Sequence, residues 1–440
     1  MTPTRDASRE FATEVVRQLR AAGYIALWAG GCVRDLLMGR PAQDFDVATS
    51  ATPEQVRDLF GKRRTLSVGQ SFGVIIVLPP NKDAAQVEVA TFRTEGVYLD
   101  GRRPTAVTFS TPEEDAKRRD FTINGMFFDP IENQVFDWVG GQVDLDRNVL
   151  RAIGDPRERM TEDKLRMLRA VRFSAALEFA LDEPTLAAVN QLASELRVVS
   201  AERIAQELRK VLTHRTRVRG FQLLVDTGLL KVIFPEIDLQ HSEALTRTLS
   251  LLPPDCSFEL AAAVLLHQIP CPVHEPRTEQ EAVGTVWEIT RRLKLSSDEM
   301  TGIAWLIGHL DCWNNAEQQS AAQLKRVLAH RLSSDLRSLV RAVRLVACLP
   351  LDPIQFVDDF LSRHSPVEIN PLELVTGRDL IEQGLTPGPK FKQLLDTLRD
   401  AQLNGEIATR EQALQKLATF LGTVPNPDIA QLGNDPSTFV

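Results

Sequence analysis

Residues 27–49, LWAGGCVRDLLMGRPAQDFDVAT, constrain the fold of this chain more than any other stretch. An apolar run ends at two glycines, a short amphipathic segment and a turn follow, and the stretch closes with Asp44, Phe45 and Asp46. This order predicts a strand, a glycine turn, a helix, a second turn and a second strand. Side chains two apart on a strand share a face, so we expect Asp44 and Asp46 to lie together while Phe45 faces the core.

These residue types suit the binding of a metal ion and a phosphate. Paired carboxylates are typical ligands of Mg²⁺, so Asp44 and Asp46 are candidate metal ligands and catalytic residues. Gly30 and Gly31 allow the backbone to approach a ligand closely, and the N–H groups at a helix start favour an anion. Each signal alone is common, and their order and spacing are what indicate a nucleotide site.

The stretch resembles the signature of the polymerase β-like nucleotidyltransferases, in particular the class II group of CCA-adding tRNA nucleotidyltransferases and bacterial poly(A) polymerases. The specific motifs of this resemblance extend over residues 24–212, and the helical remainder is similar more loosely. The resemblance implies an α+β fold, with a mixed sheet in a nucleotidyltransferase head and an all-α neck, body and tail. The expected domains are a catalytic head at 1–149, a neck with a nucleobase-selecting template helix at 150–219, a degenerate HD-like, RNA-binding body at 220–350 and a tRNA-binding tail at 351–440.

A third carboxylate, Glu88, lies in a predicted strand at residues 87–92. We expect it to complete the coordination of an ion or to take a proton from the attacking hydroxyl, with an exposed strand residue as the alternative. Two further strands are predicted at 64–68 and 72–78. Residues 95–113 are predicted to form a mobile loop, and the resemblance associates such a loop with the addition of A.

The segment RRDFTIN, which begins at Arg118, matches the second motif of the family almost letter for letter. The guanidinium groups of Arg118 and Arg119 can neutralise a triphosphate. Asp120 and Asn124 offer an acceptor and an amide that can hold a ribose 2′-OH. We expect Arg34, in the short helix after the glycines, to join these nucleotide-binding residues.

Within residues 152–173, one helix is predicted to start after Asp155-Pro156, and on it Asp163 and Arg166 project side by side at i and i+3. Asp can accept from the amino group of cytosine or adenine while Arg donates to the ring nitrogen, whereas guanine and uracil present the reverse polarity. An intrahelical salt bridge is the alternative. The family's EDxxR template, matched by Glu162, Asp163 and Arg166, implies the selection of C and A, and Arg169 is expected to bind nucleotide as well.

Residues 200–212, SAERIAQELRKVL, resemble the family's ERIxxEL segment, and we expect Glu202 and Arg203 to brace the template helix, with core packing as the alternative. Two groups of basic residues suggest a track for an RNA backbone despite the net charge of -8, although a solvated helix face would explain either group alone. The groups are Arg203, Arg209, Lys210, Arg215, Arg217 and Arg219, and then Lys325, Arg326, Arg331, Arg337, Arg341 and Arg344.

Composition excludes several classes of protein. With 440 residues, 43% of them hydrophobic and 25% charged, the chain is expected to form two to four soluble domains. No apolar run approaches a membrane span or a signal-peptide core, so a cytoplasmic location is expected. The five cysteines show no CxxC spacing, which predicts neither a disulfide framework nor a zinc site. Gln268 replaces the Asp of an HD motif and His309 lacks an obvious partner set, so we predict no hydrolase site.

The expected reaction is template-independent transfer of CMP and AMP from CTP and ATP to the 3′ end of tRNA, with Mg²⁺ held by Asp44 and Asp46 and release of pyrophosphate. No histidine precedes His214, so the head must use metal and carboxylate. The alternatives are an A-adding tRNA nucleotidyltransferase or a poly(A) polymerase and, from a different class, a catalytically inactive RNA-binding module. The VG and FG pairs after the aspartates favour the CCA-adding form, whereas the sequence determines neither the oligomeric state nor the RNA path.

Overall fold

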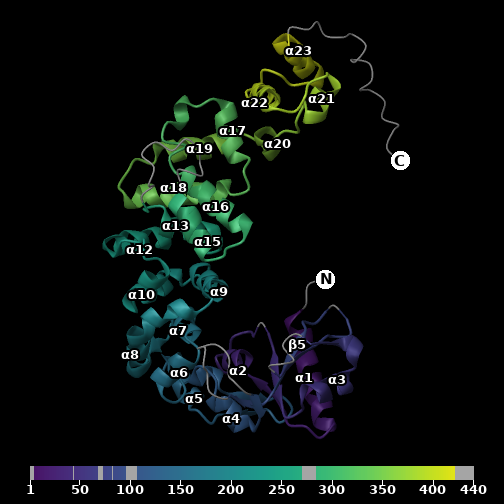
Figure 1. Cartoon of the computed structure of the whole chain (residues 1–440), viewed down its shortest axis with the longest axis vertical. Coiled ribbons are helices and arrows are strands. Elements are labelled where there is room, and N and C mark those ends of the chain that lie inside the picture. The colour runs from purple at the N-terminus through teal and green to yellow at the C-terminus, as the bar shows by residue number, and fades with distance from the viewer. Residues whose placement is uncertain are drawn as a thin grey trace. The chain divides into compact units, whose positions relative to one another are not determined.

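The structure is a computed structural model that describes residues 4–42, 44–67, 73–81, 83–95, 107–269 and 284–421. The chain divides into two compact units (Figure 1). The first unit comprises Met1–Thr246 and Glu288–Ser296, and the second comprises Arg247–Trp287 and Ser297–Val440. Most of the predicted loop at 95–113 and the chain end after residue 421 lie outside the described residues.

A seven-stranded mixed sheet organises the first unit, in the order β3-β4-β5-β2-β1-β8-β9. Strands β2 and β5 pair in parallel, and the other neighbouring strands of this sheet pair antiparallel. The strands are β1 Ala26–Ala29, β2 Asp46–Thr49, β3 Thr65–Leu66, β4 Val74–Val77, β5 Val87–Thr91, β8 Phe127–Asp129 and β9 Gln134–Phe136. A second, small sheet pairs β6 Arg93–Glu95 with β7 Val107–Phe109. The mixed-sheet head predicted from the sequence is confirmed.

Local sequence explains the elements around β1 and β2. Helix α1, Arg5–Ala21, begins after the capping residue Thr4 and buries an apolar stripe formed by Phe11, Val15, Val16 and Leu19. Helix α3, Pro53–Phe60, begins with a capping box and a proline in its first turn. The predicted order of strand, glycine turn, helix, turn and strand is confirmed, with α2, Gly31–Leu37, between β1 and β2.

Helices follow the sheet in both units. The remaining helices of the first unit are α4 Pro112–Lys117, α5 Gly141–Asp146, α6 Pro156–Glu162, α7 Leu165–Leu177, α8 Glu183–Leu192, α9 Ala201–Leu212, α10 Arg217–Asp226 and α11 Leu229–Ile233, with short 3₁₀ turns at Lys62–Arg64, Thr122–Asn124, Ala193–Val198 and Leu239–His241. Helices α12 Ser242–Ser250 and α15 Gly284–Arg292 cross the boundaries between the units. A short strand interrupts the helical pattern expected after residue 150, because β11, Ala180–Leu181, pairs in parallel with β10, Val149–Leu150.

The second unit is helical throughout its described residues. Its helices are α13 Phe258–Leu266, α16 Ser297–Gly308, α17 Ala321–Leu328, α18 Ser333–Val346, α19 Asp352–Ser362, α20 Pro366–Ile369, α21 Gly377–Glu382, α22 Pro389–Leu403 and α23 Arg410–Leu421, with a 3₁₀ turn at Ala316–Gln318. The segment at 377–417 therefore holds α21, α22 and the first part of α23. No helix among the described residues is long and apolar enough to cross a membrane.

The residues that resemble an HD motif have ordinary structural roles. Helix α13 buries its side chains on all sides. His267 Nδ1 lies 2.8 Å from the carbonyl oxygen of Val264, and burial lowers the pKa of this histidine. His309 Nδ1 lies 2.9 Å from the carbonyl oxygen of Trp305, whose ring stacks on the imidazole. Both histidines are thus held by their own helices.

Candidate active site

Three predicted catalytic carboxylates gather at one edge of the mixed sheet. Asp46 opens β2 and stands opposite Glu88 of β5 in the parallel register. Asp44 precedes β2, so the prediction that both aspartates lie on one strand is wrong. All three carboxylates are exposed, and Phe45 packs against Trp28 with ring centroids 4.8 Å apart. The strand register, rather than the i and i+2 spacing, brings Asp46 and Glu88 together.

Loss of hydration and, after it, repulsion between carboxylates raise the pKa of Asp46. The pKa of Asp46 is raised from 3.8 to about 6, first because the surrounding protein removes much of its hydration and then because of the charge of Glu88. Arg119 opposes the shift and Asp44 adds to it. Asp46 nevertheless is exposed to solvent, so a ligand can reach its carboxylate. Within the described residues none of the three carboxylates forms a salt bridge.

The donor set fits a divalent cation. Carboxylate oxygens are the ligands that hard cations prefer, and the repulsion among these groups is relieved when a positive charge binds between them. Among the described residues no three His, Cys, Asp or Glu side chains already converge on one metal-binding point. Asp44 and Asp46 therefore remain the predicted metal ligands, and Glu88 remains the predicted third carboxylate beside them.

The glycine turn leaves room for the side chain of Arg119. Gly30 has φ +75°, and a Cβ atom there would lie 3.0 Å from Nη1 of Arg119. Its N–H donates to the carbonyl of Met126 at 3.2 Å and is not available to a phosphate. Any anion binding at this turn therefore falls to Gly31 and the N–H groups that follow it, and it stays a prediction.

The two arginines predicted to bind triphosphate are held by a carboxylate that the sequence reasoning missed. Asp115, in α4, is 1% exposed and forms ion pairs with Arg118 at 2.7 Å and with Arg119 at 3.1 Å. Burial would raise the pKa of Asp115, but the two guanidinium groups outweigh it and lower the pKa. No helix was predicted here from the sequence; the signal that could have identified this residue was the capping pair Thr111 and Glu114, followed by arginines at i+3 and i+4 from Asp115.

Asp120 lies inside the protein rather than at the surface of the site. Its Oδ2 accepts from Arg169 at 2.5 Å, and its Oδ1 accepts from the amide of Asn124 at 3.2 Å and from the N–H of Phe121 at 2.9 Å. Burial would raise the pKa of Asp120, but Arg169 and Asn124 lower it to about 2. Arg34 donates to Oδ1 of Asn124 at 2.8 Å. The expected contact with a ribose stays a prediction, and Asp120 already orients Asn124.

The prediction of one continuous helix from Pro156 to Phe173 is wrong, because the helix breaks at Asp163. Helix α6 ends at Glu162 and α7 begins at Leu165, and Asp163 between them has φ -137° and ψ 104°. The carboxylate of Asp163 accepts from the N–H of Leu165 at 3.1 Å. Short acidic side chains compete with helices in this way, by binding backbone groups two residues on.

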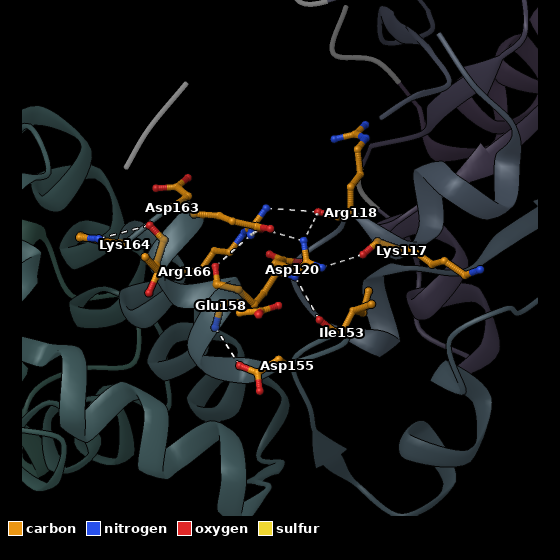
Figure 2. A network of polar contacts seen from close by, with 12 residues as sticks. Lys117, Arg118, Asp120, Ile153, Asp155, Glu158, Asp163, Lys164 and Arg166 are labelled. Atoms are coloured by element: carbon orange, nitrogen blue, oxygen red, sulfur yellow. Dashed lines mark hydrogen bonds and ion pairs between the residues drawn. The ribbon is translucent and has the colours of Figure 1, made fainter. Parts of the chain in front are cut away.

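The break gives the two template residues separate partners. Nη1 and Nη2 of Arg203, in α9, donate to the carboxylate of Asp163 at 3.2 and 2.7 Å, so the predicted bracing role of Arg203 is confirmed. Arg166 pairs with Glu162 at 2.5 Å, and the alternative of an intrahelical pair between Asp163 and Arg166 is wrong. Figure 2 shows the guanidinium of Arg166 directed toward the backbone of Arg118, with Asp120 nearby. Glu202 instead pairs with Lys294 at 2.8 Å.

Many of the basic residues predicted as an RNA track have partners in the protein. In the first group, Arg217 is 3% exposed and donates to the carbonyl of Leu212, and Arg219 donates to the carbonyl of Phe179. The partners in the second group are the Leu403 carbonyl for Lys325, Asp400 for Arg326, Glu259 for Arg331, Asp358 for Arg337 and Arg341, and the Pro350 carbonyl for Arg344. An RNA track along either group stays a prediction.

Two family descriptions match the chain. Residues 26–151 match the family described as "Poly A polymerase head domain", and residues 178–240 match "Probable RNA and SrmB- binding site of polymerase A". Together with the mixed sheet and the carboxylates at its edge, these matches define the class of the protein as a nucleotidyltransferase with a polymerase β-like head.

Relatives extend the similarity over nearly the whole chain. The CCA-adding enzyme of Streptococcus sanguinis (strain SK36) is 35% identical over 403 residues, which cover 90% of this chain and 93% of the relative. The CCA-adding enzyme of Geobacillus stearothermophilus is 34% identical over 407 residues, covering 91% and 94%. The crystal structure of the Bacillus stearothermophilus CCA-adding enzyme in complex with CTP is 31% identical, has a TM-score of 0.71 and matches over 94% of this chain and 98% of its own. The chain therefore belongs to the family of CCA-adding enzymes.

Proposed function

We propose that this protein transfers CMP and AMP from CTP and ATP to the 3′ end of tRNA without a nucleic-acid template and releases pyrophosphate. The observation that carries the proposal is the parallel register that sets Asp46 beside Glu88, near Arg119, in a chain that belongs to the CCA-adding family. The similarity to an enzyme solved with CTP supports a nucleotide substrate. A tRNA substrate would also fit the cytoplasmic location expected from the sequence.

The carboxylates support Mg²⁺ as the cofactor, with Asp44 and Asp46 as its ligands. When bound there, the ion would supply charge to stabilise the α-phosphate and pyrophosphate and would lower the pKa of the terminal hydroxyl of the RNA. Glu88, exposed at the same edge, can accept the proton of that hydroxyl.

The arginines and the template residues account for binding and selection. Arg118 and Arg119 each keep about a fifth of their side-chain surface exposed while Asp115 fixes their direction, so they can contact a triphosphate without losing that partner. Asp163, 18% exposed, keeps acceptor capacity for the amino group of cytosine or adenine. Arg166 supplies the donors for the ring nitrogen, and both bases satisfy this pair while guanine and uracil leave it unpaired.

Incorporation assays with defined RNA ends test the proposal. Transcripts of one tRNA that end before CCA, after C, and after CC are incubated with Mg²⁺ and each labelled nucleoside triphosphate. The expected result is CTP use on the first two ends, ATP use on the CC end, and then termination.

Each other result would assign the protein to a different functional class. Use of ATP alone on the CC end would identify an A-adding enzyme, and long A tracts a poly(A) polymerase. RNA binding with no incorporation would indicate an inactive RNA-binding module. An Asp46→Ala variant is the control, because incorporation that survives this change does not come from the proposed site.

A further inference from the structure

We propose that Arg159 is a positioning residue for base selection, which fixes the direction in which Arg166 presents its donors. Neither the family signature in the sequence nor the catalytic proposal assigns Arg159 a role. The inference rests on the proposed function, because it explains how the template residues of that function are held.

Arg159 joins three parts of the first unit through one guanidinium group. Its Nε donates to the carbonyl of Ile153 at 3.0 Å, and its Nη2 donates to the carbonyl of Lys117 at 3.0 Å. Its Nη1 donates to the carbonyl of Arg118 at 3.3 Å and to Oε2 of Glu162 at 2.8 Å. The side chain is 15% exposed, so these contacts are only partly screened by solvent. Arg159 therefore connects the end of α4 to the end of α6.

Arg166 uses two of the same acceptors. Its Nη1 donates to Oε2 of Glu162 at 2.5 Å, and its Nη2 donates to the carbonyl of Arg118 at 3.2 Å. A third bond, at 3.0 Å, runs from Nη1 to the carbonyl of Arg159 itself. Figure 2 shows Arg166 reaching the backbone of Arg118, while the Arg118 side chain extends away from that carbonyl. The base-reading arginine and Arg159 thus share one carboxylate oxygen and one backbone oxygen.

Sharing these acceptors has a geometric consequence. Two guanidinium groups on one carboxylate oxygen repel each other, so each keeps to its own side of Glu162. Without Arg159, Glu162 is free to turn with Arg166, and the donors of Arg166 lose their fixed direction. Selection between bases depends on donors and acceptors held in place before the nucleotide binds, because a mobile arginine can follow the acceptor of a wrong base.

The contacts also couple base selection to the triphosphate. The carbonyl of Arg118 accepts from both arginines of the template, whereas the side chain of the same residue is a proposed triphosphate ligand. A loss of Arg159 therefore loosens the template and the peptide that carries Arg118 together. The expected defect appears in nucleotide binding and discrimination rather than in binding of the tRNA.

The test uses the full-length chain and a control from the same helix. Arg157 lies two residues before Arg159 in α6 and is exposed, and within the described residues no ion pair or hydrogen bond of its side chain is found. Arg159→Met, Arg159→Lys and Arg157→Met are compared with the unmodified protein. Kinetic constants are measured for CTP and UTP on tRNA that ends before CCA, and thermal unfolding and tRNA affinity are measured beside them.

The expected result is specific to positioning. Arg159→Met lowers the preference for CTP over UTP, expressed as the ratio of kcat/KM values, by about tenfold, the size of one lost charge-assisted hydrogen bond. Its KM for CTP rises more than its kcat falls, while Tm stays within about 2 °C and tRNA affinity is unchanged. Arg159→Lys, which keeps the charge, recovers part of the preference, and Arg157→Met matches the unmodified protein.

Other outcomes overturn the inference. An unchanged CTP preference in Arg159→Met, or a proportional loss of kcat with both nucleotides that follows a loss of Tm, shows that Arg159 only supports the fold. If Arg159→Met does not fold, Glu162→Gln and Arg159→Lys provide the test, because the inference predicts that each has a weaker preference for CTP over UTP than the unmodified protein. A failure of the unmodified protein to incorporate CTP rejects the proposed function and this inference together. An active protein whose CTP preference does not change when Arg159 is replaced rejects the inference alone.

Discussion

Replacement of Asp120 by Asn removes the charge that Arg169 holds inside the first unit while keeping the size of the side chain. Asp120 is 8% exposed, and its pKa falls from 3.8 to about 2 in the folded protein. A shift of this size corresponds to about 2 kcal/mol of stability at neutral pH. Arg169, with 33% of its side chain exposed, keeps some hydration after the substitution, so the loss stays below the cost of a fully buried unpaired charge.

The stabilisation provided by the Asp120 carboxylate depends on pH. A carboxyl group whose pKa is lowered by folding stabilises the protein above its unfolded value, and the contribution is lost as the pH falls through the folded value. The difference in unfolding free energy between the original protein and Asp120→Asn should be about 2 kcal/mol at pH 7 and about half of that at pH 3.

Urea unfolding, followed by tryptophan fluorescence, is the assay. Trp28 and Trp138 belong to the same unit as Asp120, so replacing Trp287, Trp305 and Trp313 by Phe in every protein compared restricts the signal to this unit. Glu158→Gln is the matched control, because Glu158 is an exposed carboxylate and its charge should contribute little. A difference for Asp120→Asn below about 0.5 kcal/mol, or one that stays constant between pH 3 and pH 7, would refute the reasoning.

Three further predictions concern the site and its support. Asp46→Asn should lower CMP incorporation at least about 1,000-fold. In metal-free buffer above pH 6 the same substitution should raise Tm, because the pKa of Asp46 is raised to about 6 in the folded protein and the ionised carboxylate therefore disfavours folding there. An unchanged or lower Tm would contradict this prediction. Arg203→Met releases Asp163 and should reduce the preference for CTP over UTP about tenfold in the incorporation assay, whereas equal preference would assign Arg203 to packing. Gly141→Ala places a Cβ atom 2.4 Å from the carbonyl oxygen of Thr122 and should cost about 1–3 kcal/mol in denaturant unfolding, and a neutral result would mean that the backbone yields at this point.

The sequence by itself determined the elements of the head. The order of strand, glycine turn, helix and strand from β1 to β2 was predictable, because it depends on contacts between near neighbours in the chain. The identity of the acidic and basic residues of the site was readable for a different reason, since their motifs occur in a fixed order.

Tertiary structure decided which of those residues meet. The parallel register of β2 and β5 sets Asp46 opposite Glu88, and no local sequence pattern predicts that register. The helix breaks at Asp163 although its sequence suits a helix, because Arg203, forty residues later, and the N–H of Leu165 both bind its carboxylate. The distant partner Arg203, together with the nearby N–H of Leu165, outweighs a helix propensity of a few tenths of a kcal/mol per residue, and Arg203 is placed there only by the folded chain.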